Sequence, residues 1–153
     1  MSFALTERLT VADLTFPEQM VLWAVRHWRA GGGDWRKVER EFQRACGPAA
    51  ARIALDALDR MLGAIEQGAC RGLDCHALCC GGVSPDEQCV LALLAAGQAD
   101  DGIGAKHAAL SVAPPCRSAH LLELAAVAGA ALDIGLGPLP ARYAMRLGGE
   151  TVH

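Results

Sequence analysis

Four cysteines and one histidine fall within the eleven residues CRGLDCHALCC, at positions 70–80, and a further cysteine follows at position 89. Thiolate sulfur and imidazole nitrogen are the ligands that zinc prefers in proteins, and a structural zinc site needs four of them. The pattern therefore predicts a metal-binding element, structural if the ion is permanent and sensory if it exchanges. The candidate ligands are Cys70, Cys75, His76, Cys79, Cys80 and Cys89.

The spacing of these cysteines, C-x4-C-x3-C-C-x8-C, leaves the ligand set open. Zinc sites usually present two separated pairs of ligands, whereas this cluster is one crowded group. If residues 75–80 are helical, Cys75 and Cys79 lie one turn apart, and so do His76 and Cys80. An iron–sulfur cluster is the weaker alternative because the usual C-x2-C-x2-C run is absent. Zinc is therefore the expected cofactor, if there is one.

Two other roles for the cysteines remain open. They could act as redox or regulatory thiols, or they could fill a helical core, since free cysteine is among the most buried residue types. Cys46 and Cys89 fall where an apolar helix face is expected, and the core role is favoured for both. Cysteine–histidine catalysis would need a third group to orient the imidazole, and the sequence shows none. A non-enzymatic protein is therefore predicted.

The composition predicts one globular domain over residues 1–153, with a core at about 15–138 and irregular tails. Hydrophobic residues make up 52% of the 153-residue chain and charged residues 20%, which suffices for a core. The net charge of −3 gives no overall attraction to nucleic acid. The N-terminus lacks a secretory pattern, so a cytoplasmic location with reduced thiols is expected, and seven cysteines argue against a disulfide framework.

Helix start and stop signals divide the chain into helices, with no alternating run that demands a strand. Thr15 with Glu18, and Ser84 with Glu87, have the spacing of capping boxes. The fold class predicted is all-α, a compact bundle of about five to six helices with a cysteine-rich loop between the third and fourth. The expected helices run from Thr15 to the glycines at 31–33, from Asp34 to Gly47, from Pro48 to Gly68, from Ser84 to about Gln98, over 103–112, and from about Arg117 to Leu136.

The apolar segments place two of these helices inside the protein. CVLALLAAG, at 89–97, has almost no polar face and predicts the central helix. Leu121 to Leu136 is broken by Glu123 and Asp133 and falls short of the ~20 residues of a membrane span, so it predicts a buried helix rather than a membrane segment. This alanine-rich helix could also mediate a homo-oligomer.

A helical interaction or transcription-associated protein is the alternative. Trp23, Trp28 and Trp35 are interleaved with basic residues, and the second and third helices could form a helix-turn-helix whose phosphate contacts would be made by Arg36, Lys37, Arg40 and Arg44. Glu39 and Glu41 dilute this positive charge, so nucleic acid is the less favoured partner. In this alternative the cysteines are core residues and the partner is an unknown protein.

Overall fold

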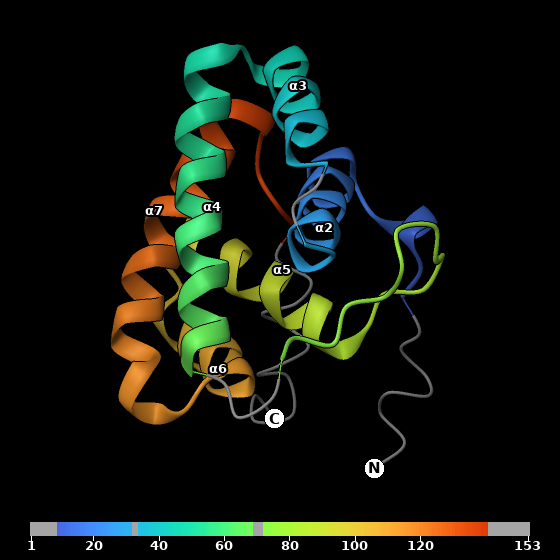
Figure 1. Ribbon diagram of the computed structural model, residues 1–153. Coiled ribbons are helices and arrows are strands. Elements are labelled where there is room, and N and C mark those ends of the chain that lie inside the picture. The colour runs from blue at the N-terminus through green and yellow to red at the C-terminus, as the bar shows by residue number, and fades with distance from the viewer. Residues whose placement is uncertain (1–8, 32–33, 69–71, 141–153) are drawn as a thin grey trace.

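The computed structural model describes residues 9–31, 34–68 and 72–140, and over these ranges the regular secondary structure is helical, with no β-strand (Figure 1). The prediction of an all-α bundle is confirmed. The elements are η1 (Val11–Asp13), α2 (Phe16–Arg29), α3 (Trp35–Cys46), α4 (Pro48–Gly68), α5 (Pro85–Gln98), α6 (Gly102–Val112), η2 (Pro115–Arg117) and α7 (Ser118–Leu136). Each expected helix is present, with ends within two residues of those predicted. Residues 1–8 and 141–153, where tails were expected, lie outside the described ranges.

The helices α4, α5 and α7 form the centre of the bundle. α4 and α7 pack side by side, α5 packs against α6 and α7, and α3 covers one end of α4 (Figure 1). Residues 90–96 of α5 are all buried, as the absence of a polar face predicts. The buried apolar residues form one cluster from Leu9 to Leu139, which extends the core slightly beyond the predicted 15–138.

Two glycines allow the backbones of α5 and α7 to approach closely. A Cβ added at Gly97 would lie 2.5 Å from the carbonyl oxygen of Ala125, and one at Gly129 would lie 2.9 Å from that of Leu94. Both distances are shorter than packed atoms allow, so only glycine fits at this crossing.

The two predicted capping boxes are confirmed, whereas Asp34, the residue at which the next helix is expected to begin, does not cap it through its side chain. Thr15 and Ser84 each cap their helix and complete capping boxes with Glu18 and Glu87. Asp34 occupies the cap position of α3, but its side chain makes no capping hydrogen bond. Its backbone, with φ −108° and ψ 22°, lies outside the extended region in which a cap side chain reaches the first helical N–H groups.

The helix α7 is buried along one side. Leu121, Ala125 and Leu132 are buried, whereas Val127 and Ile134 are exposed, so the prediction of a buried helix holds for one face. Among the described residues, Pro115–Leu136 is the one stretch with the length and apolar composition of a membrane span, and 33% of its most apolar window is buried. Core helices of soluble proteins share that composition.

Candidate functional site

The segment 72–84, which contains Cys75, Cys79 and Cys80, is wrapped around one buried arginine of α2. Arg26 Nε donates to Glu87 Oε2 at 2.8 Å, and the two side chains are 3% and 0% exposed. Arg26 also donates through Nη1 to the carbonyl oxygen of Cys80 at 2.8 Å and through Nη2 to that of Gly82 at 2.7 Å. One guanidinium thus fixes both the cysteine-bearing backbone and the first turn of α5.

Glu87 holds the same segment from the other side. Its Oε1 accepts from the N–H of Ser84 at 2.9 Å, and its Oε2 accepts from the N–H of His76 at 3.1 Å. The hydrogen bond from Arg26 to Glu87 is the main cause that raises the pKa of the Arg26 guanidinium, against the opposing effect of its burial. A buried ion pair is stable when further hydrogen bonds satisfy both ions, and this pair has them.

The N-terminal segment also binds the backbone of the cysteine-bearing segment. Thr10 and Gly82 form an isolated antiparallel bridge, in which Val11 N–H donates to the carbonyl oxygen of Gly81 at 2.7 Å and Val83 N–H donates to that of Leu9 at 3.1 Å. The backbone of residues 80–83 is therefore held both by Arg26 and by the chain before α2.

The segment is not helical at 75–80, so the helical pairing of Cys75 with Cys79 does not form. A tight turn, closed by Cys80 N–H donating to the carbonyl oxygen of Ala77 at 2.9 Å, instead brings Cys80 back toward His76. Cys80 Sγ lies 3.5 Å from His76 Nδ1, which is also 3.0 Å from the carbonyl oxygen of Gly82. His76 and Cys80 thus lie close together through a turn, and not through the helical spacing on which the sequence argument was conditional.

This sulfur–nitrogen separation matches that of two zinc ligands. With zinc bonds of about 2.3 Å to sulfur and 2.0–2.1 Å to nitrogen, a tetrahedral angle places the two ligand atoms about 3.5 Å apart. Cys79, which directly precedes Cys80 in the chain, is exposed. Cys79 and Cys80 line a shallow hollow of about 210 Å³, whose other lining residues include Leu78, Trp23 and Arg26. An ion could therefore reach the sulfur atoms from solvent.

The remaining candidate ligands are less well placed. Cys75 is half-buried, and desolvation, with Glu87 as the next cause, raises the pKa of its thiol to about 12, which disfavours the thiolate that a metal needs. Cys89 packs against the core from α5, as does Cys46 from α3. Cys70 lies outside the described residues. Within the described ranges, no three Cys, His, Asp or Glu side chains form a group that could hold a metal ion.

The candidate phosphate contacts of the alternative lie on α3. Arg36, Lys37, Arg40 and Arg44 are all exposed, whereas Arg26 is buried. An arginine enclosed in an ion pair cannot also reach a phosphate group. In the helix-turn-helix interpretation, the phosphate contacts therefore depend on the basic residues of α3 alone. The interpretation stays a prediction.

No protein-family model, curated protein or solved structure matches this chain. The functional assignment therefore depends on the chemistry of the described residues. Sequence reasoning missed the two residues that organise this site, Arg26 and Glu87. One feature of the sequence could have indicated that Arg26 is buried: it lies one helical turn after Leu22, on the apolar side of α2.

Proposed function

We propose that residues 70–80 form a binding element for a soft divalent metal ion such as zinc, in a cytoplasmic protein without catalytic activity. The observation that supports this proposal is the 3.5 Å separation of Cys80 Sγ and His76 Nδ1, which suits two ligands of one tetrahedral ion. Cys79 is the third candidate ligand, because it is exposed and directly precedes Cys80 in the chain. Cys70 is the fourth candidate, assigned from its place in the sequence.

Binding an ion here would release the thiol protons and break one hydrogen bond. The thiols of Cys79 and Cys80 would lose their protons, and His76 would carry its proton on Nε2, so that Nδ1 leaves the carbonyl oxygen of Gly82. The backbone at Cys80 and Gly82 would stay attached to Arg26. An anchored backbone with adjustable side chains suits an ion that exchanges, and a sensory role is therefore favoured over a permanent structural one.

Elemental analysis of untagged protein, purified without added metal, tests this proposal. We expect near-stoichiometric zinc, and in cobalt-loaded protein the ligand-field bands of a tetrahedral site with sulfur ligands. The joint Cys79→Ser and Cys80→Ser variant should lose the metal, and His76→Ala should weaken its binding. The control is Cys116→Ser, because Cys116 is an exposed cysteine in η2 outside the cluster.

Two results would overturn the proposal. One is an absence of zinc together with no cobalt bands on titration of the reduced protein. The other is a metal content that survives the Cys79→Ser and Cys80→Ser substitutions unchanged. Circular dichroism of each variant establishes whether its helices remain folded, so that loss of metal can be separated from loss of structure.

A further inference from the structure

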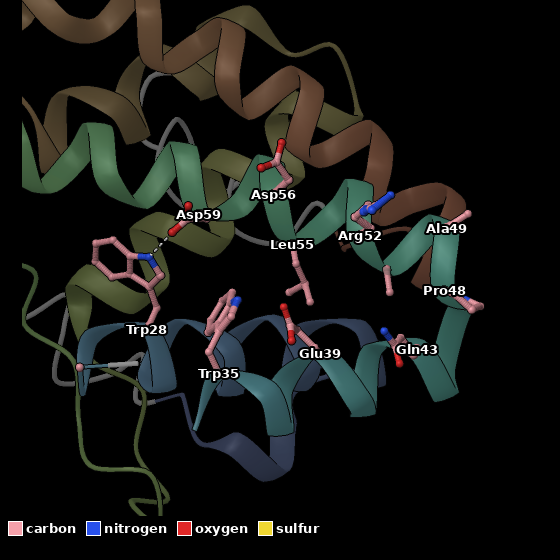
Figure 2. Close-up of a pocket in the computed structure, with 12 residues that line it drawn as sticks. Trp28, Trp35, Glu39, Gln43, Pro48, Ala49, Arg52, Leu55, Asp56 and Asp59 are labelled. Carbon is pink, nitrogen blue, oxygen red and sulfur yellow. Dashed lines mark hydrogen bonds between the residues drawn. The ribbon is translucent and has the colours of Figure 1, made fainter. Parts of the chain in front are cut away.

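A groove of about 1170 Å³ opens between α2, α3 and α4, on residues that the cysteine segment does not use (Figure 2). Its lining combines two indole rings with carboxylates. The lining residues are Trp28, Gly31, Trp35, Glu39, Gln43, Pro48, Ala49, Ala51, Arg52, Leu55, Asp56 and Asp59. Three of the four charged residues among them are acidic.

Helical spacing brings the aromatic and acidic groups to one end of this groove. Trp35 and Glu39 lie one turn apart on α3, and Leu55 and Asp59 lie one turn apart on α4. Trp28, near the end of α2, donates from its indole Nε1 to Asp59 Oδ1 at 2.8 Å, which fixes both side chains at the mouth of the groove (Figure 2). The two indoles are half-buried and the two carboxylates are exposed.

We propose that this end of the groove binds a small organic cation of the alkylammonium class. The faces of indole rings attract cations more strongly than those of other aromatic side chains. Glu39 and Asp59 point toward the space between α3 and α4 and supply the opposite charge (Figure 2). Leu55 gives the apolar floor that alkyl groups need. Aromatic faces with nearby carboxylates are the chemistry that recognises substituted ammonium ions.

The charges around this end favour a small cation over a long basic chain. Asp56 pairs with Arg60 at 3.4 Å, and Arg52 lines the part of the groove toward Ala49. The exposed basic residues of α3 lie outside the groove lining and would repel an extended polycation. The negative charge is therefore confined to the region of Glu39 and Asp59.

Choline and its uncharged isostere 3,3-dimethylbutan-1-ol form the probe pair. In a nuclear magnetic resonance titration of the full chain, choline should shift the indole N–H signals of Trp28 and Trp35. Trp23 is the internal control, since it lies in the other hollow with its ring centroid 4.8 Å from that of His27. The neutral isostere should bind at least about tenfold more weakly, because it lacks the charge on which cation–π attraction depends.

Substitutions at two positions that line the groove locate the site. Glu39→Gln and Trp35→Leu should each weaken choline binding several-fold, whereas Glu123→Gln, at an exposed site on α7, should leave it unchanged. If Trp35→Leu unfolds the protein, Glu39→Gln still decides the question. The proposal is overturned if choline shifts neither indole up to its solubility limit, if the isostere binds equally well, or if Glu39→Gln has no effect.

Discussion

At the scale of single residues, cysteines close together in the sequence have different environments. Cys79 is exposed, and Cys80 lies against His76, whereas Cys75 is half-buried near Glu87 with a thiol pKa of about 12 instead of the ordinary 9.0. The reactivity of a cysteine rises with the fraction of its thiol that is ionised and with its exposure to solvent. Cys75 should therefore be the inert thiol of the segment.

The raised pKa of Cys75 predicts a loss of stability in alkali. Folding favours the protonated thiol, so this contribution is complete below about pH 9 and is lost as the pH rises through about 12. The free energy of unfolding should therefore fall more steeply between these values in the wild type than in Cys75→Ala. Urea unfolding across this window measures the difference. Cys116→Ala should follow the wild-type curve, and parallel curves for Cys75→Ala and the wild type would contradict the assignment.

At the scale of elements, the helix ends follow local signals in the sequence, and the distance between α5 and α7 depends on single glycines. The boxes at Thr15 and Ser84 define helix starts because each is closed within four residues. Gly97 and Gly129 look unremarkable in sequence, since a glycine within a helix usually only weakens it. Their role becomes visible only where the second helix lies across them.

Gly97→Ala should destabilise the protein. The new Cβ would meet the backbone of α7, so the helices must separate, and we expect a net loss of about 1–2 kcal/mol after the gain in helix propensity. Gly63→Ala on α4 is the matched control, because a Cβ there meets nothing within 4 Å. It should stabilise the protein by roughly 0.5–1 kcal/mol. Urea denaturation measures both variants, and equal effects would show that the crossing tolerates a methyl group.

The sequence could not predict the arrangement of the cysteine segment for a related reason. Glu87 is fully explained as a capping residue, and Arg26 resembles one more basic residue beside the tryptophans. Their pairing spans 61 positions, and no local pattern reports it. The sequence predicts a cysteine-rich loop here and offers helical spacing only as a condition for pairing ligands, whereas distant hydrogen bonds hold the backbone and a turn pairs Cys80 with His76.

At the scale of the whole molecule, the Arg26–Glu87 pair joins two helices of the bundle to the cysteine-bearing segment. Through Arg26 and Glu87, α2 is joined to α5 and to the backbone at 76–84. The N-terminal segment joins the same backbone at Gly82. The candidate metal element thus depends on a contact made outside the cysteine cluster.

Arg26→Met should therefore destabilise the protein by about 3–5 kcal/mol, because it leaves Glu87 buried without an opposite charge. Arg26→Met combined with Glu87→Gln should recover part of this loss, since the neutral amide removes the unpaired buried charge, although its single oxygen can accept from only one of the Ser84 and His76 N–H groups. Urea unfolding gives the free energies, and amide hydrogen exchange should show faster opening at 76–84 in the single variant. A double variant no more stable than the single one would contradict this account.

The separation of Arg26 from Glu87 also has a consequence for biosynthesis. During translation, α2 is made 61 residues before its acidic partner, which at roughly 5–20 residues per second is a delay of about 3–12 s. During that time the guanidinium must stay hydrated, so the apolar side of α2 cannot dock in its final place. The nascent chain should therefore expose Val21, Leu22 and Val25 until α5 is made, which gives chaperones that bind apolar segments a defined interval in which to act.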